Sequence, residues 1–174
     1  LLDFAAVSQQ MNDEELFSLL NQYLTFVGPL IRKYGGYIQS YQGEKFTALF
    51  KGAEKAVKAS LEMQETINMF NEDQPYVNIR LGTRIHSDSA LIGTLGENER
   101  IDGAILSPSH SHIKTALTRL TNKLQARTLT TKNVVSACNK NAKRYQVRRI
   151  GSVASFKASS NDKYQDSMEV YELL

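Results

Sequence analysis

The chain has 174 residues, 41% of them hydrophobic, which is enough for one sizeable core and short for two. Its 21 basic and 18 acidic residues leave a formal charge of +3, a balance that excludes an electrostatic commitment to nucleic acid or to an anionic membrane. A single cysteine, Cys138, and the lack of an apolar run near the roughly 20 residues that cross a bilayer favour one soluble, cytoplasmic domain over residues 1–174, cut from a larger protein.

The first predicted element is a long helix that begins at Asn12. Asn12 suits the N-cap, and Glu15, three residues later, completes a capping box. Apolar residues then recur at helical intervals up to Tyr34. The pair Gly35-Gly36 offers the left-handed backbone on which helices end, so the sequence predicts a helix over residues 12–34.

A hairpin and a second helix follow. Two aromatic-rich segments, Tyr37–Tyr41 and Phe46–Phe50, are joined by QGEK, which predicts two strands with a tight turn. Glu44 therefore lies at the tip of the hairpin. From Ala53 to Phe70 the apolar residues are spaced three and four apart, which predicts an amphipathic helix.

The second half of the chain predicts further strands around one more helix. Apolar and polar residues alternate from Val77 to Ile85, as in a strand that helices half cover, and a helical stripe runs from Ile113 to Leu124. The other predicted strands are Ala90–Gly96, Ile101–Leu106, Tyr145–Ile150 and Met168–Leu173. Because helices alternate with hairpins, the fold class is α+β or α/β.

These segments resemble, in the same order, the catalytic domain of class III adenylyl and guanylyl cyclases. The hairpin YQGEKFTALF is similar to the family's IGDAVMAVF, and IRLGTRIHSDSALIGTLG is similar to IRIGIGIHTGPLMLGTIG. GENERIDGAILS resembles GEEERMDGTVIS of a bacterial branch, and GSVASFKAS and MEVYELL resemble the closing VKGK and VYEL segments. The resemblance implies an α+β fold with a ferredoxin-like βαββαβ core, acting as a head-to-tail dimer whose active sites lie between the subunits.

The reaction implied by this resemblance needs two metal ions, Mg²⁺ or Mn²⁺, held by two carboxylates. The match of DFAAVSQQM to GFTxLSExM puts the first carboxylate immediately before Leu1, with Asp3 at a glycine position. Glu44 stands where the family has the second carboxylate, an aspartate, and its longer side chain weakens a site that demands near-octahedral geometry. The alternative is that Glu44 is an ordinary solvated charge on a turn.

Positions that the family uses to bind the nucleotide hold altered residues. Ser40 and Ala104 stand at the two places from which the family reads the purine, so the base loses its hydrogen-bonding partners. Lys157 matches a basic residue of the VKGK segment, from which family members reach the triphosphate. The neighbouring glycine and second lysine of that segment are replaced, so the alternative is a solvated lysine.

The segment SPSHSHIKTAL aligns with SDAVNLAARL of the bacterial branch, whose asparagine and arginine steady the transition state. One register puts Ser111 and Thr115 at these two places, and the other puts His112 and Ala116 there. Neither register supplies an arginine. A lost transition-state donor costs roughly 3 to 4 kcal/mol of barrier, or two to three decades of rate.

The two histidines of this segment, His110 and His112, also raise the question of a zinc site. Residues two apart share a face on a strand, whereas a helix is predicted to start here, with Pro108 in its first turn. No cysteine or acid lies nearby to complete a zinc site. We favour the alternative in which these polar residues cap the helix.

Three functional hypotheses follow from the resemblance. The first is a catalytically degenerate cyclase domain that serves as a regulatory or dimerisation module in a larger signalling protein, as a homodimer or paired with another cyclase-type domain. The second is a weak or heterodimeric cyclase that forms cyclic nucleotide from ATP or GTP. The third is a nucleotide sensor that binds ATP or GTP, with Mg²⁺ or Mn²⁺, without cyclising it.

Overall fold

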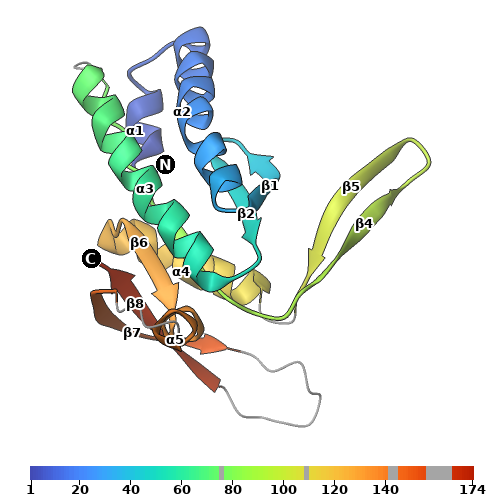
Figure 1. Cartoon of the computed structure of the whole chain (residues 1–174). Helices are drawn as coiled ribbons and strands as arrows, with labels where there is room; N and C mark the ends of the chain where they lie inside the picture. The colour runs from blue at the N-terminus through green and yellow to red at the C-terminus, as the bar shows by residue number, and fades with distance from the viewer. Residues whose placement is uncertain (75–76, 108–109, 141–144, 156–165) are drawn as a thin grey trace.

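The structure is a computed structural model, and it describes residues 1–74, 77–107, 110–140, 145–155 and 166–174. Figure 1 shows how its helices and strands are arranged. In chain order the elements are α1 (Phe4–Ser8), α2 (Asp13–Lys33), β1 (Gly36–Gln42), β2 (Lys45–Phe50), α3 (Ala53–Asp73), β3 (Thr83–Ile85), β4 (Leu91–Glu97), β5 (Arg100–Leu106), α4 (His110–Leu124), β6 (Thr128–Thr131), α5 (Lys132–Lys140), β7 (Val147–Ser155) and β8 (Asp166–Leu173).

Helix α2 begins as its sequence predicts. The Asn12 side chain accepts a hydrogen bond from the Glu15 amide at 2.9 Å, and the Glu15 carboxylate accepts one from the Asn12 amide at 2.9 Å. This reciprocal pair satisfies two amides that no helical carbonyl can reach. The capping box is therefore confirmed.

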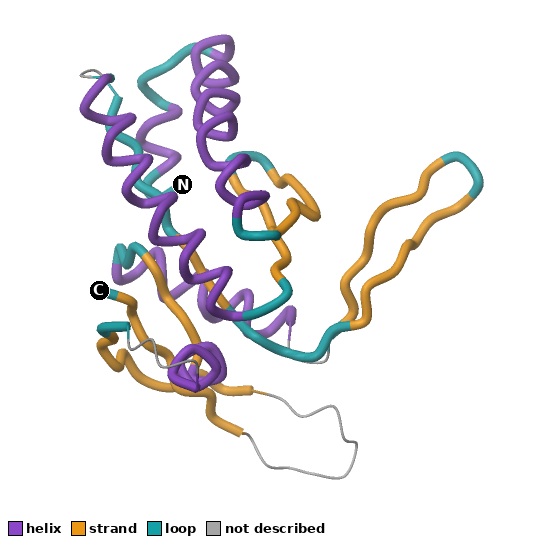
Figure 2. The backbone as a smooth tube through the Cα atoms, in the orientation of Figure 1, coloured by secondary structure: helices purple, strands orange, loops and turns teal. Residues whose placement is uncertain are grey.

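The strands form one sheet of four and two separate hairpins. In the four-stranded sheet the order is β3-β6-β8-β7, with β3 parallel to β6 and the other pairs antiparallel. The hairpin β1–β2 turns at Gly43, whose φ of +60° lies in the left-handed region. The hairpin β4–β5 forms an arm that extends away from the body of the molecule (Figures 1 and 2).

Helices cover both faces of the four-stranded sheet. On one face, Val57 of α3 and Cys138 of α5 form an apolar cluster with Leu173 of β8. On the other face, α4 contributes Ile113 and Leu117 to a cluster with strand residues. A third and larger cluster joins α2 to α3. Since helices and mostly antiparallel strands pack in this way, the α+β class is confirmed.

The strand predicted from Val77 to Ile85 is wrong in its extent, since only Thr83–Ile85 is a strand and Arg80 adds an isolated bridge to Leu2. The predicted alternation does hold for burial, because Ile79 and Ile85 are buried. The Asn71 side chain on α3 explains the difference: it donates to the Ile79 carbonyl at 2.8 Å and accepts from its amide at 2.9 Å. A side chain satisfies this backbone in place of a neighbouring strand.

Three short elements, α1, β6 and α5, were not predicted. Strand β6 is the buried run TLTT, in which polar and apolar residues do not alternate in type. Its hydroxyls are nonetheless satisfied: Thr128 shares a hydrogen bond with Ser60 at 3.1 Å, and Thr130 donates to the Ile85 carbonyl at 3.2 Å. The β-branched character of TLTT is the signal that would have found this strand.

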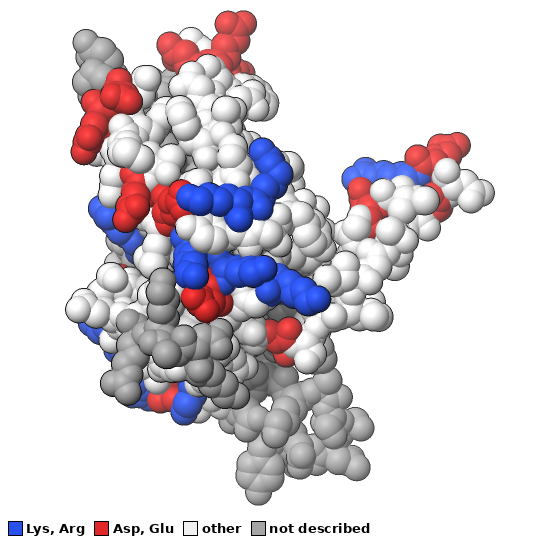
Figure 3. All heavy atoms as spheres, viewed as in Figure 1, with Lys and Arg blue, Asp and Glu red and all other residues white. Residues whose placement is uncertain are grey.

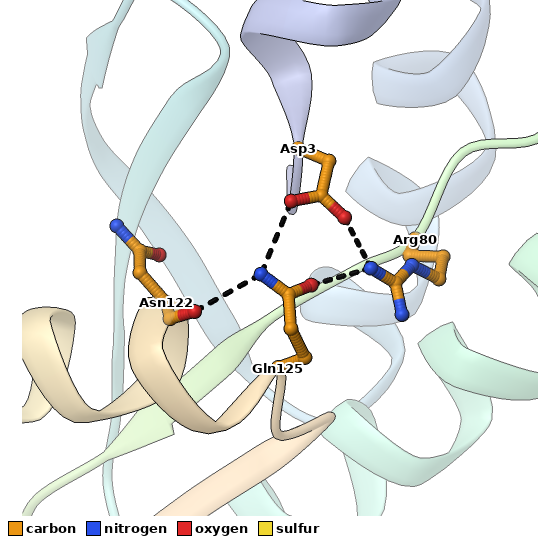
Figure 4. A network of polar contacts seen from close by, with 4 residues as sticks. All are labelled: Asp3, Arg80, Asn122 and Gln125. Atoms are coloured by element: carbon orange, nitrogen blue, oxygen red, sulfur yellow. Dashed lines mark hydrogen bonds and ion pairs between the residues drawn. The ribbon is translucent and has the colours of Figure 1, made fainter.

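A polar network ties the N-terminal segment to the end of α4 (Figure 4). Arg80 contacts both the Asp3 carboxylate and the Gln125 side chain. Gln125 in turn donates to Asp3 at 3.1 Å and to the Asn122 carbonyl at 3.0 Å. Asp3 and Gln125 both have positive φ, +50° and +52°. The network thus holds two residues in a backbone conformation that non-glycine residues rarely adopt.

Candidate functional site

The candidate site is a cavity of about 720 Å³ beside the hairpin turn. Its walls come from β1–β2, the start of α3, β3 with the segment after it, the base of the arm, and α4. Pockets of roughly 300 to 1,000 Å³ accommodate ligands of nucleotide size. Four basic side chains (Lys45, Lys51, Arg84 and Lys114) and two acidic ones (Glu44 and Asp88) line it, so its potential favours anions.

Glu44, the predicted metal ligand, lies on the cavity wall with its side chain only 18% exposed. Glu44 is thus more enclosed than a solvated charge on a turn, while its role as a metal ligand stays a prediction. Its carboxylate pairs with Lys45 Nζ at 3.1 Å, and the Tyr23 hydroxyl donates to its carbonyl at 3.4 Å. Burial raises the pKa of Glu44, but hydrogen bonds from its own backbone and from Lys45 outweigh burial and lower it. Glu44 is therefore an ionised carboxylate with a cation already beside it.

Arg84 lies on the same wall, and sequence reasoning missed it. The signal was present, because Arg84 falls where the similar segment IRIGIGIHTG has a glycine. Its side chain is partly buried on β3. Burial lowers the pKa of Arg84, and the charge of Glu44 raises it. A guanidinium remains protonated under such shifts, so Arg84 is a fixed positive charge facing the cavity.

His86 and Asp88 line the cavity next to Arg84. His86 Nδ1 shares a hydrogen bond with the Thr131 hydroxyl at 3.0 Å, in keeping with the structural role that its position at a strand end predicts. The Asp88 carboxylate accepts hydrogen bonds from the Ser107 hydroxyl at 2.7 Å and from the Ser89 amide at 2.8 Å. These contacts fix the segment after β3 to the end of the arm.

Helix α4 presents Lys114 and Thr118 to the cavity, together with the buried Leu117. Of the predicted transition-state positions, Thr115 is exposed beside Lys114, and Ala116 is half-buried on the next face. His112 is exposed and does not line the cavity. Position 111 follows His110, the first residue of the helix, and its side chain lies outside the described residues. Because residues three and four apart share a helical face, Thr115 lies closer than Ala116 to the face that presents Lys114 and Thr118.

The predicted base-reading residues lie on neighbouring elements outside the cavity lining. The Ser40 hydroxyl donates to the Gln39 side chain at 2.8 Å, and Gln39 donates to the Gly103 carbonyl at 2.8 Å. Gly103 precedes Ala104, so the structure brings β1 and β5 together at these positions. The resemblance implies a lysine at the first place and an acid or a threonine at the second, and neither residue is of these types.

The described residues offer one of the two carboxylates that the resemblance implies for a divalent metal centre, and a protein cation already pairs with it. Glu44 is one carboxylate with Lys45 paired to it and Arg84 on the same wall. Mg²⁺ is usually bound through one or two carboxylates together with substrate phosphates, in near-octahedral geometry, so a cation paired to the carboxylate competes with it. Within the described ranges, no group of three or more His, Cys, Asp or Glu side chains is arranged to hold a metal ion. Lys157, the predicted triphosphate contact, lies outside the described residues.

Solved structures share this α+β fold. The chain aligns with a bacterial light-regulated adenylyl cyclase with a TM-score of 0.79 and 19% identity, covering 99% of this chain and 48% of that one. With the adenylyl cyclase CyaB from P. aeruginosa the TM-score is 0.73 at 22% identity, covering 98% of this chain and 88% of that one.

A curated relative supports the same class. Over 143 residues the chain is 28% identical to an adenylate cyclase of Anabaena cylindrica, covering 76% of this chain and 28% of that protein. No protein-family profile matches the chain. The chain therefore has the fold of class III adenylyl and guanylyl cyclase catalytic domains, and the resemblance found in its sequence is confirmed. It spans about a quarter of the length of this curated relative.

The part of the chain that the structure describes holds no helix that is both long and apolar enough to cross a membrane.

Proposed function

We propose that this chain is a cyclase-type domain that has lost catalysis and acts as a regulatory and dimerisation module of a larger signalling protein. The observation that carries the proposal is the composition of α4 beside the cavity. Thr115 and Ala116 occupy the two candidate places for the arginine that the resemblance implies. A missing donor of this kind costs about two to three decades of rate, and the pairing of the Glu44 carboxylate with Lys45 adds to the loss.

The dimerisation part of the proposal is supported by the arm β4–β5. Its large apolar side chains are 56 to 69% exposed, namely Leu91, Ile92, Leu95, Ile101 and Leu106. The arm extends from the body, and charged side chains of both signs are concentrated at its tip (Figure 3). Leu91, Leu95 and Leu106 share one face of the hairpin, and Ile92 and Ile101 share the other. Exposed apolar surface of this kind marks an interaction site. We infer that a second copy of this chain covers it.

Incubation of the purified chain with ATP or GTP, in Mg²⁺ and separately in Mn²⁺, tests the loss of catalysis. We expect no cyclic nucleotide above an enzyme-free blank. Formation of cyclic nucleotide by the chain alone at an ordinary enzymatic rate contradicts the proposal. Sedimentation velocity at increasing concentration tests the other half: a dimer is expected, and a monomer at high concentration argues against the dimerisation module.

One observation favours the second hypothesis, a weak or heterodimeric cyclase. Lys114 brings a positive charge from α4 to the cavity that Glu44 lines. An ammonium is a point charge and lacks the bidentate fork of a guanidinium, so any contribution to transition-state binding is reduced. Mixing the chain with a competent cyclase domain and Mn²⁺-ATP or Mn²⁺-GTP distinguishes the two: more product than the competent domain alone gives supports the heterodimer.

A further inference from the structure

The loss of catalysis does not explain why a charged side chain, Arg84, lies on a partly buried wall of the cavity. Arg84 carries a positive charge on a partly buried wall, yet no ion pair to it lies within salt-bridge distance among the described residues. Glu44, the nearby acid that interacts with its charge, already pairs with Lys45 at 3.1 Å. Removing a charge from water without pairing it is costly, so an anionic ligand would relieve this cost.

The neighbourhood of Arg84 indicates which anion fits. Lys51 of the β2–α3 connection and Lys114 of α4 reach the same cavity from other walls. Positive groups on three walls match an extended anion with several charges, and guanidinium geometry matches phosphate oxygens in a bidentate manner. The base-reading positions, Ser40 and Ala104, lie outside the lining. Recognition therefore rests on the polyphosphate and not on the base.

We propose that Arg84 takes the place of a divalent cation, so that this cavity binds nucleoside triphosphates and other short polyphosphates without a metal ion. In a metal-dependent site the cation neutralises the phosphates and is itself held by carboxylates. Here a protein cation, Arg84, lies on the cavity wall beside a carboxylate that already pairs with Lys45. A guanidinium binds phosphate but lowers no water pKa and activates no nucleophile. This inference rests on the proposed loss of catalysis, because it requires that bound triphosphate is not converted to product.

Isothermal titration calorimetry of the purified chain tests this proposal, with ATP, GTP and inorganic triphosphate, each in EDTA and in excess Mg²⁺. We expect all three to bind in EDTA, with affinities for ATP and GTP within about threefold of each other, because no base contact discriminates them. Mg²⁺ should weaken binding, because it neutralises the phosphates that Arg84 contacts. No binding in EDTA, or binding that requires Mg²⁺, overturns the proposal.

Variants assign the effect to Arg84. Arg84→Gln should weaken triphosphate binding in EDTA about tenfold or more, the loss expected for a charge-assisted contact, while Arg84→Lys should retain part of the affinity. Arg80→Gln is the matched control: Arg80 lies four residues earlier, contacts Asp3 and does not line the cavity, so its loss should leave binding unchanged. A thermal melt of each variant separates loss of binding from loss of folding, and equal binding by Arg84→Gln and the unchanged chain overturns the assignment.

The glycine variant gives a second, independent readout. Arg84→Gly restores the residue of the similar segment and frees Glu44 from one neighbouring cation. We expect this variant to gain Mn²⁺-dependent binding of triphosphate and to lose metal-free binding. Retention of metal-free binding contradicts the proposal. Because these readouts measure binding, cyclic-nucleotide formation by the unchanged chain would overturn the proposed function while leaving the binding result to stand on its own.

Discussion

At the scale of single residues, Asp3 shows how a local departure from a family pattern is compensated. The similar segment has a glycine here, and the backbone keeps the left-handed φ of +50° that a glycine adopts without cost. For a residue with a Cβ atom this conformation costs roughly 1 to 2 kcal/mol. The Asp3 side chain offsets part of that cost through Arg80 and Gln125.

Substitution of Asp3 separates the cost of its backbone conformation from the contribution of its side-chain contacts. Asp3→Gly loses the exposed contacts, worth about 0 to 1 kcal/mol for a surface ion pair, and gains a relaxed backbone. Asp3→Ala loses the same contacts and keeps the backbone cost. We expect urea unfolding to show the glycine variant within about 1 kcal/mol of the unchanged chain, and the alanine variant about 1 kcal/mol below the glycine variant. Equal stability of the two variants would mean that the backbone conformation carries no cost.

At the scale of elements, the arm makes the dimerisation proposal testable. Leu95 on β4 is 60% exposed, so replacing it should leave the fold intact. Leu95→Asp puts a charge into the surface that a second copy would cover, and removes the burial of a leucine worth about 1.5 to 3 kcal/mol. We expect the dimer dissociation constant, measured by sedimentation equilibrium, to rise about tenfold or more.

The neighbouring Thr94 provides the control for this substitution. Thr94 is also exposed on β4, and successive residues of a strand point to opposite faces. Thr94→Asp therefore adds the same charge to the opposite face of the arm, which carries Ile92 and Ile101. If only Leu95→Asp weakens the dimer, the second copy covers the Leu95 face, whereas equal weakening by both variants would show that the contact is not confined to that face.

Elements that are stabilised by contacts close in sequence could be predicted, and elements that depend on distant contacts could not. Helix α2 carries its own capping box and apolar stripe, so its start at Asn12 could be read directly. The extended segment around Ile79 could not, because its backbone is satisfied by Asn71 from another helix. Strand β6 likewise depends on partners far along the chain, such as Ser60. Local signals predict local structure, and these contacts are not local.

At the scale of the whole molecule, the same contrast holds for the candidate site. Glu44 was predicted because a hairpin motif fixes which residue lies at the turn. Arg84 was missed because alternation shows that it is a polar position of a strand but not which wall it joins. Only the packing of β3 beside the hairpin places it on the wall that Glu44 lines. The position that we propose to have altered the chemistry of the site is thus one whose role depends on tertiary structure.

The loss of stability at low pH also depends on the whole molecule, because Glu169 links β8 to α5 and to β7. Its carboxylate on β8 accepts from Lys132 of α5 at 2.6 Å and from Arg149 of β7 at 2.9 Å. The Lys132 hydrogen bond, aided by Arg149, lowers the pKa of Glu169 below its ordinary value of 4.5. Hydrogen bonds from Lys33 and Tyr34 lower the pKa of Glu62 in the same direction.

Depressed carboxyl pKa values determine the direction of the pH dependence. The stability contributed by such a group is present above its unfolded pKa and is lost as the pH falls through its folded pKa. We therefore expect the free energy of unfolding in urea to change little between about pH 7 and pH 5 and to decline below about pH 4.5. Glu169→Gln should lower stability at neutral pH and make the decline shallower, since one of the groups that protonate is gone. A decline as steep as that of the unchanged chain would show that Glu169 and its two partners do not contribute to the loss of stability at low pH.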